Sequence, residues 1–231
     1  MMAVKEPTRA ARGLVITGTD TEIGKTVVSA MVAARYRNEV DLAYWKPVAS
    51  GSEEDRDVDT VAHLSGAEVL PEEYLLSAPL SPHLAARLEE RWVDPERILE
   101  RYRGLVAERP ERALVIEGVG GLMVPLNDDG YLLIELLTRL ALPCLVVARS
   151  SLGTINHTLL TLEALRRRGL EVAGVVLDGP PNPENRAAIR NFGDVEIIGQ
   201  VLPMDPLDPQ AVATWARAFD LPGRLRRYLA G

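Results

Sequence analysis

One stretch near the N-terminus restricts the possible folds more than any other part of the chain. It runs from Gly18 to Thr26 with the sequence GTDTEIGKT, follows the apolar residues 14–16 and leads into a helix-like pattern. A loop that joins a strand to a helix and ends in Gly-Lys-Thr is typical of a P-loop, whose backbone N–H groups surround a polyphosphate. The loop is one residue longer than usual, because its first glycine is Gly18 rather than position 19. The sequence therefore predicts a phosphate site here.

Lysine is rare in this chain, and its positions are informative. Only three of the 26 basic residues are lysine, namely Lys5, Lys25 and Lys46, and the others are arginine. A compact ammonium fits a narrow phosphate pocket better than a planar guanidinium does. We therefore interpret Lys25, inside the loop, as chemically required, and we suspect the same of Lys46.

The rest of the chain alternates short apolar runs with longer amphipathic segments. This pattern predicts an α/β protein of P-loop NTPase-like fold, with a mostly parallel sheet and helices on both faces. From the length and the hydrophobic content of 47% we expect a single domain over residues 1–231. The expected strands are 13–17, 42–46, 113–117, 142–147, 172–177 and 195–198. The expected helices are 25–37, 58–64, 82–91, 95–108, 131–140, 154–168, 185–191, 209–218 and 222–229.

Charge and composition exclude several classes of function. The formal net charge is −7, whereas nucleic-acid backbones are bound by net basic faces, so we expect no nucleic-acid partner. No uncharged apolar run approaches the roughly 18 residues of a membrane helix, and residues 1–12 lack the apolar core of a secretory signal. We expect no membrane association and a cytoplasmic location. The single cysteine, Cys144, cannot form a cysteine-based metal site.

Polar groups follow three of the expected strands at their carboxyl ends, where open α/β sheets bind ligands. At the first end, Lys25 would neutralise phosphate charge and Thr26 would reach Mg²⁺. The second carries Lys46, which alternatively is a surface lysine whose stem covers apolar residues. The third carries Glu117, either a Mg²⁺ carboxylate or a helix cap or solvated edge. Asp59 is a weaker candidate for a second ligand, because the acid-rich run around it is more often a solvated loop.

Five strings, in this order and spacing, resemble the dethiobiotin synthase family of the biotin pathway: GTDTEIGKT, YWKPVASG, APLSPHLAA, VIEGVGGLMVPL and SLGTINHTLLT. The resemblance covers roughly residues 14–203, and KPVASG and EGVGG are its most specific parts. It implies ATP- and Mg²⁺-dependent closure of the ureido ring of dethiobiotin from 7,8-diaminopelargonic acid and CO₂. In the family's reaction one amine becomes a carbamate, a carbamate oxygen attacks the γ-phosphate of ATP, and the second amine then displaces phosphate.

The same resemblance implies roles for individual residues. Those expected to act in catalysis, with the two lysines flanking the carbamate and the γ-phosphate, are Lys46, Lys25 and Thr21. The Mg²⁺ ligands would be Thr26, Asp59 and Glu117. The nucleotide would contact Glu22, Ile23, Gly24, Lys25, Thr26, Val27, Asp178 and Pro203. The substrate would contact Thr21, Lys46, Ser50, Gly118, Gly121, Gly153 and Asn156.

Two further expectations come from the resemblance. In the family, the region of Gly153 and Asn156 receives the substrate's carboxylate across a two-fold interface, which implies a homodimer. At position 178 this chain has Asp where the family often has an Asn that reads adenine. An ionised carboxylate only accepts hydrogen bonds, whereas an amide also donates them. We therefore expect a relaxed nucleotide preference.

A second interpretation is a dimeric P-loop ATPase switch of the partitioning or metal-insertion type. Such proteins share the fold and usually carry a lysine near the start of the loop, where this chain has Asp20. Asp20 and the KPVASG string favour the synthase. A third interpretation, an amidotransferase-type synthase acting on corrin rings, usually has a much longer chain and a nucleophilic cysteine, whereas Cys144 is expected to be a buried strand residue.

Overall fold

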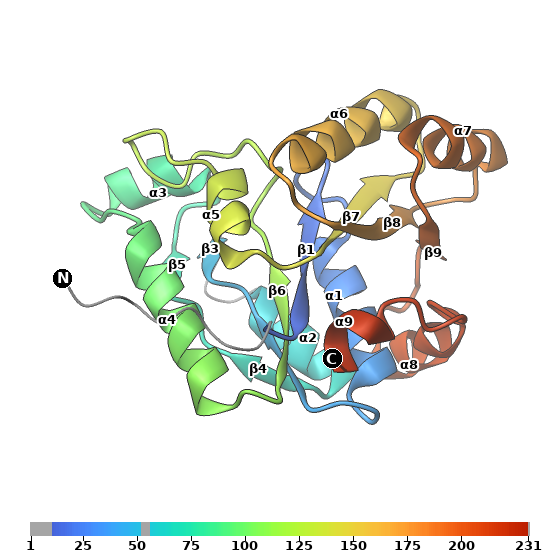
Figure 1. Cartoon of the computed structure of the whole chain (residues 1–231), viewed down its shortest axis with the longest axis horizontal. Coiled ribbons are helices and arrows are strands. Elements are labelled where there is room, and N and C mark those ends of the chain that lie inside the picture. Colours follow the sequence, from blue (N-terminus) through green and yellow to red (C-terminus); the bar gives the residue numbers. More distant parts are fainter. Residues whose placement is uncertain (1–10, 52–55, 231) are drawn as a thin grey trace.

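The computed structural model describes residues 11–51 and 56–230. In that part of the chain a seven-stranded sheet forms the centre, and every strand pairs in parallel with its neighbours in the order β4-β2-β6-β1-β7-β8-β9 (Figure 1). A short parallel pair, β3 and β5, lies outside this sheet. The strands are β1 (Gly13–Gly18), β2 (Leu42–Trp45), β3 (Val48–Ser50), β4 (Glu68–Leu70), β5 (Tyr74–Leu76), β6 (Ala113–Glu117), β7 (Cys144–Arg149), β8 (Val172–Asp178) and β9 (Ile197–Val201). Most of the segment considered above as a secretory signal, residues 1–10, lies outside the described residues.

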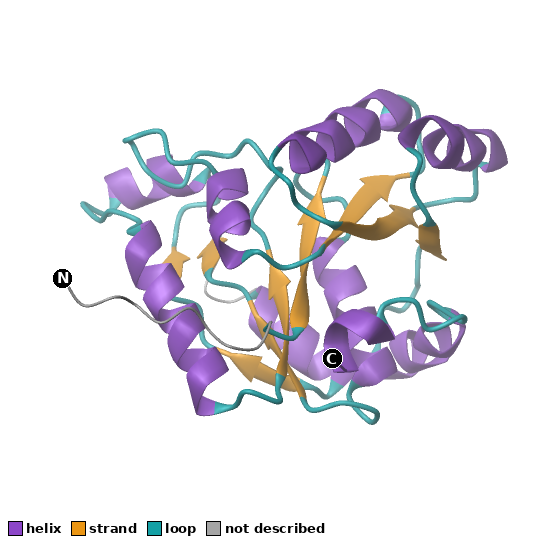
Figure 2. Cartoon of the chain, viewed as in Figure 1, coloured by secondary structure: helices purple, strands orange, loops and turns teal. Residues whose placement is uncertain are grey.

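Helices cover both faces of the central sheet (Figure 2). One face packs against α1 (Lys25–Tyr36), α2 (Asp57–Ser65), α8 (Pro209–Ala218) and α9 (Arg226–Ala230). The other face packs against α3 (Pro82–Leu88), α4 (Pro95–Glu108), α5 (Leu133–Leu140), α6 (Thr154–Arg167) and α7 (Pro183–Gly193). Along β1 the side chains alternate, since Leu14 and Ile16 face the α1 side and Val15 faces the other. The expected α/β fold, with a parallel sheet covered on both faces, is confirmed.

Several elements differ from the sequence expectations. The three-residue strands β3, β4 and β5 are additional, because so few residues show no clear alternation. Helix α5 begins at Leu133 rather than at 131, because Leu132 forms a β-bridge with Pro125. Helix α9 begins at Arg226 rather than at 222, because residues 219–222 and 224–225 form turns. None of the helices formed by the described residues is long and apolar enough to cross a membrane.

The register of the sheet brings the three polar strand ends together. Ile16 of β1 lies opposite Glu117 of β6, and Trp45 of β2 lies opposite Ile116. Because β6 lies between β2 and β1, Glu117 has Lys46 on one side and the loop that follows Gly18 on the other. The expected meeting of these residues at one edge of the sheet therefore follows from strand order.

Candidate functional site

The loop between β1 and α1 has the backbone geometry of a phosphate cradle. Gly24 caps the N-terminus of α1 with φ of 82°, a left-handed conformation that favours glycine, and Glu22 also has a positive φ of 52°. Lys25 is 7% exposed, and its ammonium donates to the backbone oxygen of Asp20 at 2.7 Å. The lysine therefore folds back across the loop, and the free N–H groups of α1 face the same side.

Glu117 is the centre of a buried polar cluster at the end of β6. Its carboxylate is 0% exposed and lies within hydrogen-bonding distance of four side chains. Oε1 accepts from Lys46 Nζ at 2.8 Å and lies 3.1 Å from the hydroxyl of Thr26. Oε2 accepts from the hydroxyls of Ser29 at 2.7 Å and Tyr44 at 2.9 Å. A cap or solvated-edge role for Glu117 does not fit a fully buried carboxylate with these partners.

A second carboxylate, that of Asp57, joins the cluster from the first residue of α2. Its Oδ1 lies 2.6 Å from the Thr26 hydroxyl, and its Oδ2 accepts from Lys46 Nζ at 2.5 Å. Lys46 thus bridges Asp57 and Glu117, and at 6% exposure it is not the surface lysine of the alternative interpretation. The arrangement places two acids and an ammonium beside the phosphate loop.

The structure corrects the choice of acid on α2. The side chain of Asp59 is 68% exposed and pairs with Arg56 at 3.8 Å, away from Thr26 and Lys46. Two residues along an α-helix turn a side chain by about 200°, so Asp57 and Asp59 cannot face the same site. One sequence signal favoured Asp57, because it continues the stripe of Val61 and Ser65 at four-residue spacing, and both of these are buried.

The oxygen donors of the cluster fit a magnesium ion. Thr26 Oγ1 lies beside one oxygen of Asp57 and one of Glu117, and hard oxygen ligands of this kind are those that Mg²⁺ takes together with phosphate oxygens and water. Within residues 11–51 and 56–230 there is no group of three or more His, Cys, Asp or Glu side chains that could hold a metal ion by itself. The donor set therefore suits an ion that is shared with a nucleotide.

The two lysines respond differently to burial. Burial lowers the pKa of Lys25 from 10.5 to about 8, and the ammonium of Lys46 adds to this, although Glu117 opposes it. Burial alone would also lower the pKa of Lys46, but Glu117 and Asp57 outweigh it and raise that pKa. Lys46 therefore keeps its charge at neutral pH, and Lys25 is the more easily neutralised of the two.

Two residues of the cluster, Ser29 and Tyr44, were not predicted from the sequence. Ser29 lies four residues after Lys25 on α1, and Tyr44 lies two residues before Lys46, so each shares a face with a predicted residue. These spacings were available signals. Burial, followed by the charge of Glu117, raises the pKa of Tyr44 well above its usual value, so its hydroxyl remains a donor at neutral pH.

The loop after β6 packs on the phosphate loop. A Cβ atom at Gly121 would lie 3.6 Å from the backbone oxygen of Thr19, and one at Gly120 would lie 3.7 Å from Thr21 Oγ1. Gly118 instead contacts α5, since a Cβ there would lie 3.0 Å from Leu133. Among the other predicted residues, Thr21 is exposed beside this loop and Ser50 is half-buried at the end of β3.

The other residues predicted to contact the nucleotide lie at the end of β8, in the phosphate loop, on α1 and after β9. Asp178 lies at the end of β8, and its Oδ2 is 2.6 Å from the position of a Cβ at Gly24, so this acid adjoins the phosphate loop. Burial raises its pKa. Ile23 is buried, with its side chain beside Gly18, Val27 is half-buried on α1, and Pro203 is exposed beyond the end of β9.

Gly153 and Asn156 lie at the exposed start of α6. Gly153 caps this helix with φ of 92°, Asn156 is exposed, and Leu152 beside them is 99% exposed. Among the described residues neither forms a hydrogen bond with the Glu117 cluster. Within one chain, therefore, no hydrogen bond links these two predicted substrate residues to the Glu117 cluster.

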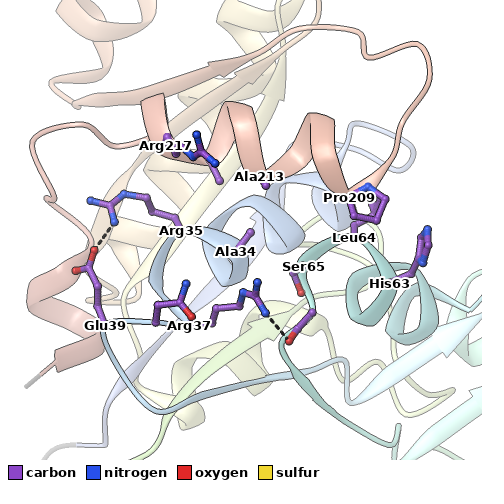
Figure 3. Close-up of a pocket in the computed structure, with 13 residues that line it drawn as sticks. Ala34, Arg35, Arg37, Glu39, His63, Leu64, Ser65, Pro209, Ala213 and Arg217 are labelled. Carbon is purple, nitrogen blue, oxygen red and sulfur yellow. Dashed lines mark hydrogen bonds and ion pairs between the residues drawn. The ribbon is translucent and has the colours of Figure 1, made fainter.

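A cavity of about 570 Å³ lies elsewhere, between the C-terminal ends of α1 and α2 and one side of α8 (Figure 3). Arg35 pairs there with Glu39, and Arg37 donates to the backbone oxygen of Gly66 at 3.0 Å. The lining includes none of the predicted site residues. The candidate site is therefore the edge around Glu117 and not this cavity.

The chain is similar in sequence and in fold to several known proteins. A protein-family model described as an AAA domain matches residues 12–211. ATP-dependent dethiobiotin synthetase BioD of Paramagnetospirillum magneticum is 47% identical over 203 residues, 87% of this chain and 93% of that protein. The protein of the same name from Agrobacterium fabrum is 46% identical over 211 residues, 90% of this chain and 94% of that one. A ParA family ATPase from Chlorobium tepidum has a TM-score of 0.54 at 13% identity, over 95% of this chain and 97% of its own, which shows the fold alone.

Proposed function

The chain belongs to the dethiobiotin synthetase family, and we infer that it is an ATP-dependent dethiobiotin synthetase, a ligase of biotin biosynthesis. Identity of 47% and 46% to two synthetases over nearly their whole length carries this conclusion. The Glu117 cluster beside the phosphate loop supports it, because ammonium and carboxylate groups converge where a triphosphate would end.

The proposed reaction transfers a phosphoryl group to a carbamate. CO₂ adds to one amine of 7,8-diaminopelargonic acid, which loses a proton and becomes a carbamate. A carbamate oxygen then attacks the γ-phosphorus of ATP, and ADP leaves. The second amine attacks the carbonyl carbon of the mixed anhydride and loses a proton, phosphate leaves with one former carbamate oxygen, and the ureido ring closes.

Two ammonium groups would stabilise the charge that develops in the phosphoryl transfer. Lys25, within the phosphate loop, would neutralise the β- and γ-phosphates, and Lys46 would lie between the γ-phosphate and the carbamate. Phosphoryl transfer depends mainly on positioning and on charge neutralisation, which fixed cations supply inside a buried site. The raised pKa of Lys46 supports this role, because that ammonium stays charged at neutral pH.

Thr26, Asp57 and Glu117 would hold the Mg²⁺, with Asp57 in place of the predicted Asp59. When bound, this ion would neutralise phosphate charge and help to orient the β- and γ-phosphate oxygens. Support comes from the Thr26 hydroxyl, which lies within 3.1 Å of both carboxylates.

The substrate would be bound by two sets of residues. Thr21, Ser50, Gly118 and Gly121 would contact the diamine or carbamate from the strand ends. Gly153 and Asn156 would bind the carboxylate from a second copy of the chain in a cytoplasmic homodimer. Their exposure at the start of α6, with Leu152 fully open beside them, supports a contribution across an interface.

Asp178 would meet the nucleotide base and relax the preference for adenine. Comparison of ATP, GTP and CTP at equal concentrations tests this. We expect kcat/KM values within about tenfold of one another, because a carboxylate cannot donate to the ring nitrogen of adenine. A preference for ATP by several orders of magnitude would overturn the idea.

The assignment of function is tested by product formation. Purified protein supplied with diamine, bicarbonate, ATP and Mg²⁺ should form dethiobiotin, and ADP release should require the diamine. Diamine-independent ATP hydrolysis without product would instead support the ATPase switch.

A further inference from the structure

The two hydroxyls on Glu117 Oε2 have no part in the proposed reaction. Ser29 donates to this oxygen at 2.7 Å and Tyr44 at 2.9 Å, and both residues are 0% exposed. The other oxygen, Oε1, is the one that faces Thr26 and Lys46. The carboxylate therefore has a closed side, which is Oε2 with its two hydroxyl donors, and an open side, which is Oε1 facing the site.

Three secondary structure elements enclose the closed side. Tyr44 of β2 lies opposite Val115 in the sheet register, and Val115 and Glu117 share one face of β6 because they are two residues apart. Ser29 reaches the same face from α1, which packs over it. A carboxylate oxygen has about two lone-pair directions, so two hydroxyl donors occupy those of Oε2.

We propose that Ser29 and Tyr44 are positioning residues that leave only Oε1 of Glu117 for a metal ion, and that they thereby favour Mg²⁺ over Ca²⁺. This rests on the proposed function in so far as Glu117 is a metal ligand. Mg²⁺ demands a small, near-octahedral site and takes single carboxylate oxygens, whereas Ca²⁺ is larger and readily binds both oxygens of one carboxylate. Freeing Oε2 would let Glu117 bind with both oxygens.

The simpler alternative is that Ser29 and Tyr44 only satisfy the hydrogen bonding of a buried acid. The chain offers a matched control for this alternative. Tyr36, also on α1 and also 0% exposed, donates its hydroxyl to the buried carboxylate of Asp220 at 2.5 Å. Tyr36→Phe removes an equivalent hydrogen bond at a place unconnected to the cluster.

The test measures metal binding directly. Mg²⁺ and Ca²⁺ are titrated separately, by calorimetry, into wild type, Tyr44→Phe, the double variant Ser29→Ala with Tyr44→Phe, and Tyr36→Phe, each saturated with a non-hydrolysable ATP analogue. Loss of groups that orient a metal ligand typically lowers affinity by about 10- to 100-fold. We expect Mg²⁺ affinity to fall by this factor in the double variant and Ca²⁺ affinity not to fall, because Ca²⁺ can then bind both oxygens of Glu117, so that the Mg²⁺/Ca²⁺ affinity ratio drops at least about tenfold. Tyr36→Phe should keep the wild-type ratio.

A ratio within twofold of wild type in the double variant, or an equal drop in Tyr36→Phe, would overturn the proposal. If the double variant does not fold, Tyr44→Phe decides alone, because it deletes only an oxygen atom and should still lower the ratio several-fold. The outcome is separable from that of the proposed function. Wild type that forms dethiobiotin with an unchanged ratio in the variants refutes only the positioning role, and a lowered ratio without product formation in wild type refutes only the ligase.

Discussion

Glu117 and Asp220 are two buried acids near opposite ends of α1, each bonded to a tyrosine hydroxyl, and they have different surroundings. Asp220 is 1% exposed, and within the described part of the chain its hydrogen-bond donors are all neutral, namely Tyr36 OH and the backbone N–H groups of Arg224 and Leu225. Glu117 accepts from hydroxyls and also from the ammonium of Lys46, which it shares with Asp57. Lys25 and Tyr36, which begin and end this helix, are roughly 16 Å apart along its axis.

The difference shows how a structural acid can be told from a functional one. The donors of Asp220 come from its own turn and from the helix on which that turn packs, so its hydrogen bonds fasten the C-terminal segment to α1. The donors of Glu117 come from α1, β2 and the residue after β2, and a second carboxylate lies beside them. Burying two acids around one lysine costs free energy unless a further cation joins them. Such an arrangement of charges is typical of a functional site.

The largest expected effect comes from Lys46→Ala. Loss of one fixed group that stabilises transition-state charge typically costs about 10²- to 10³-fold in kcat, and this variant also leaves Asp57 and Glu117 facing each other. Dethiobiotin formation should fall by at least that factor, with circular dichroism confirming the fold. Activity within tenfold of wild type would remove Lys46 from the mechanism.

The next effect separates the two acids of α2. Asp57→Asn should lower affinity for Mg²⁺ in the presence of nucleotide by about 10- to 100-fold, as for other changes around a metal site. Asp59→Asn, the matched control two residues away, should stay within twofold, because its side chain points outward. Equal effects of the two changes would restore Asp59 as a candidate ligand.

The Asp220 region should respond in stability and not in activity. Tyr36→Phe removes a hydrogen bond to a charged group, which is worth about 1.5–3 kcal/mol. Urea titration should show that loss in the free energy of unfolding, while kcat of the folded enzyme stays within twofold of wild type. Unchanged stability together with impaired catalysis in Tyr36→Phe would contradict the assignment of Asp220 as a structural acid and Glu117 as a functional one.

The smallest expected effect is a pH dependence of stability that belongs to Lys25. Its pKa is about 8 in the folded protein against 10.5 as a model value, so the unfolded chain binds more protons between these pH values. The free energy of unfolding should therefore rise with pH across this window, by about 1–2 kcal/mol from pH 7.5 to 9.5. Below pH 8 both states hold the proton and the full cost of burying the charge is present.

The measurement is a difference between wild type and Lys25→Met. In urea titrations at pH 7.5, 8.5 and 9.5, the free energy of unfolding of wild type minus that of the variant should rise with pH, since methionine does not titrate. A difference curve that is flat over this range would show that the pKa of Lys25 is not lowered.

The sequence predicted the parts of the site that depend on strand ends and on residue type. The phosphate loop, Lys46 and Glu117 were found because each lies at the carboxyl end of an apolar run that forms a strand of the central sheet. Asp57 was missed because two acids two residues apart look alike until the helix phase is fixed. Ser29 and Tyr44 were missed because serine and tyrosine inside apolar segments look like ordinary core residues, and only the packing of α1 on β2 and β6 shows that both reach Glu117.

The most direct test of the proposed chemistry follows one oxygen atom. Wild-type protein is given diamine, ATP, Mg²⁺ and freshly added bicarbonate labelled with ¹⁸O, and the phosphate released is examined by mass spectrometry. If a carbamate oxygen attacks the γ-phosphorus beside Lys46, each phosphate formed with dethiobiotin should carry one oxygen from bicarbonate. Phosphate without this label, its fourth oxygen coming from water, would contradict the phosphorylated carbamate.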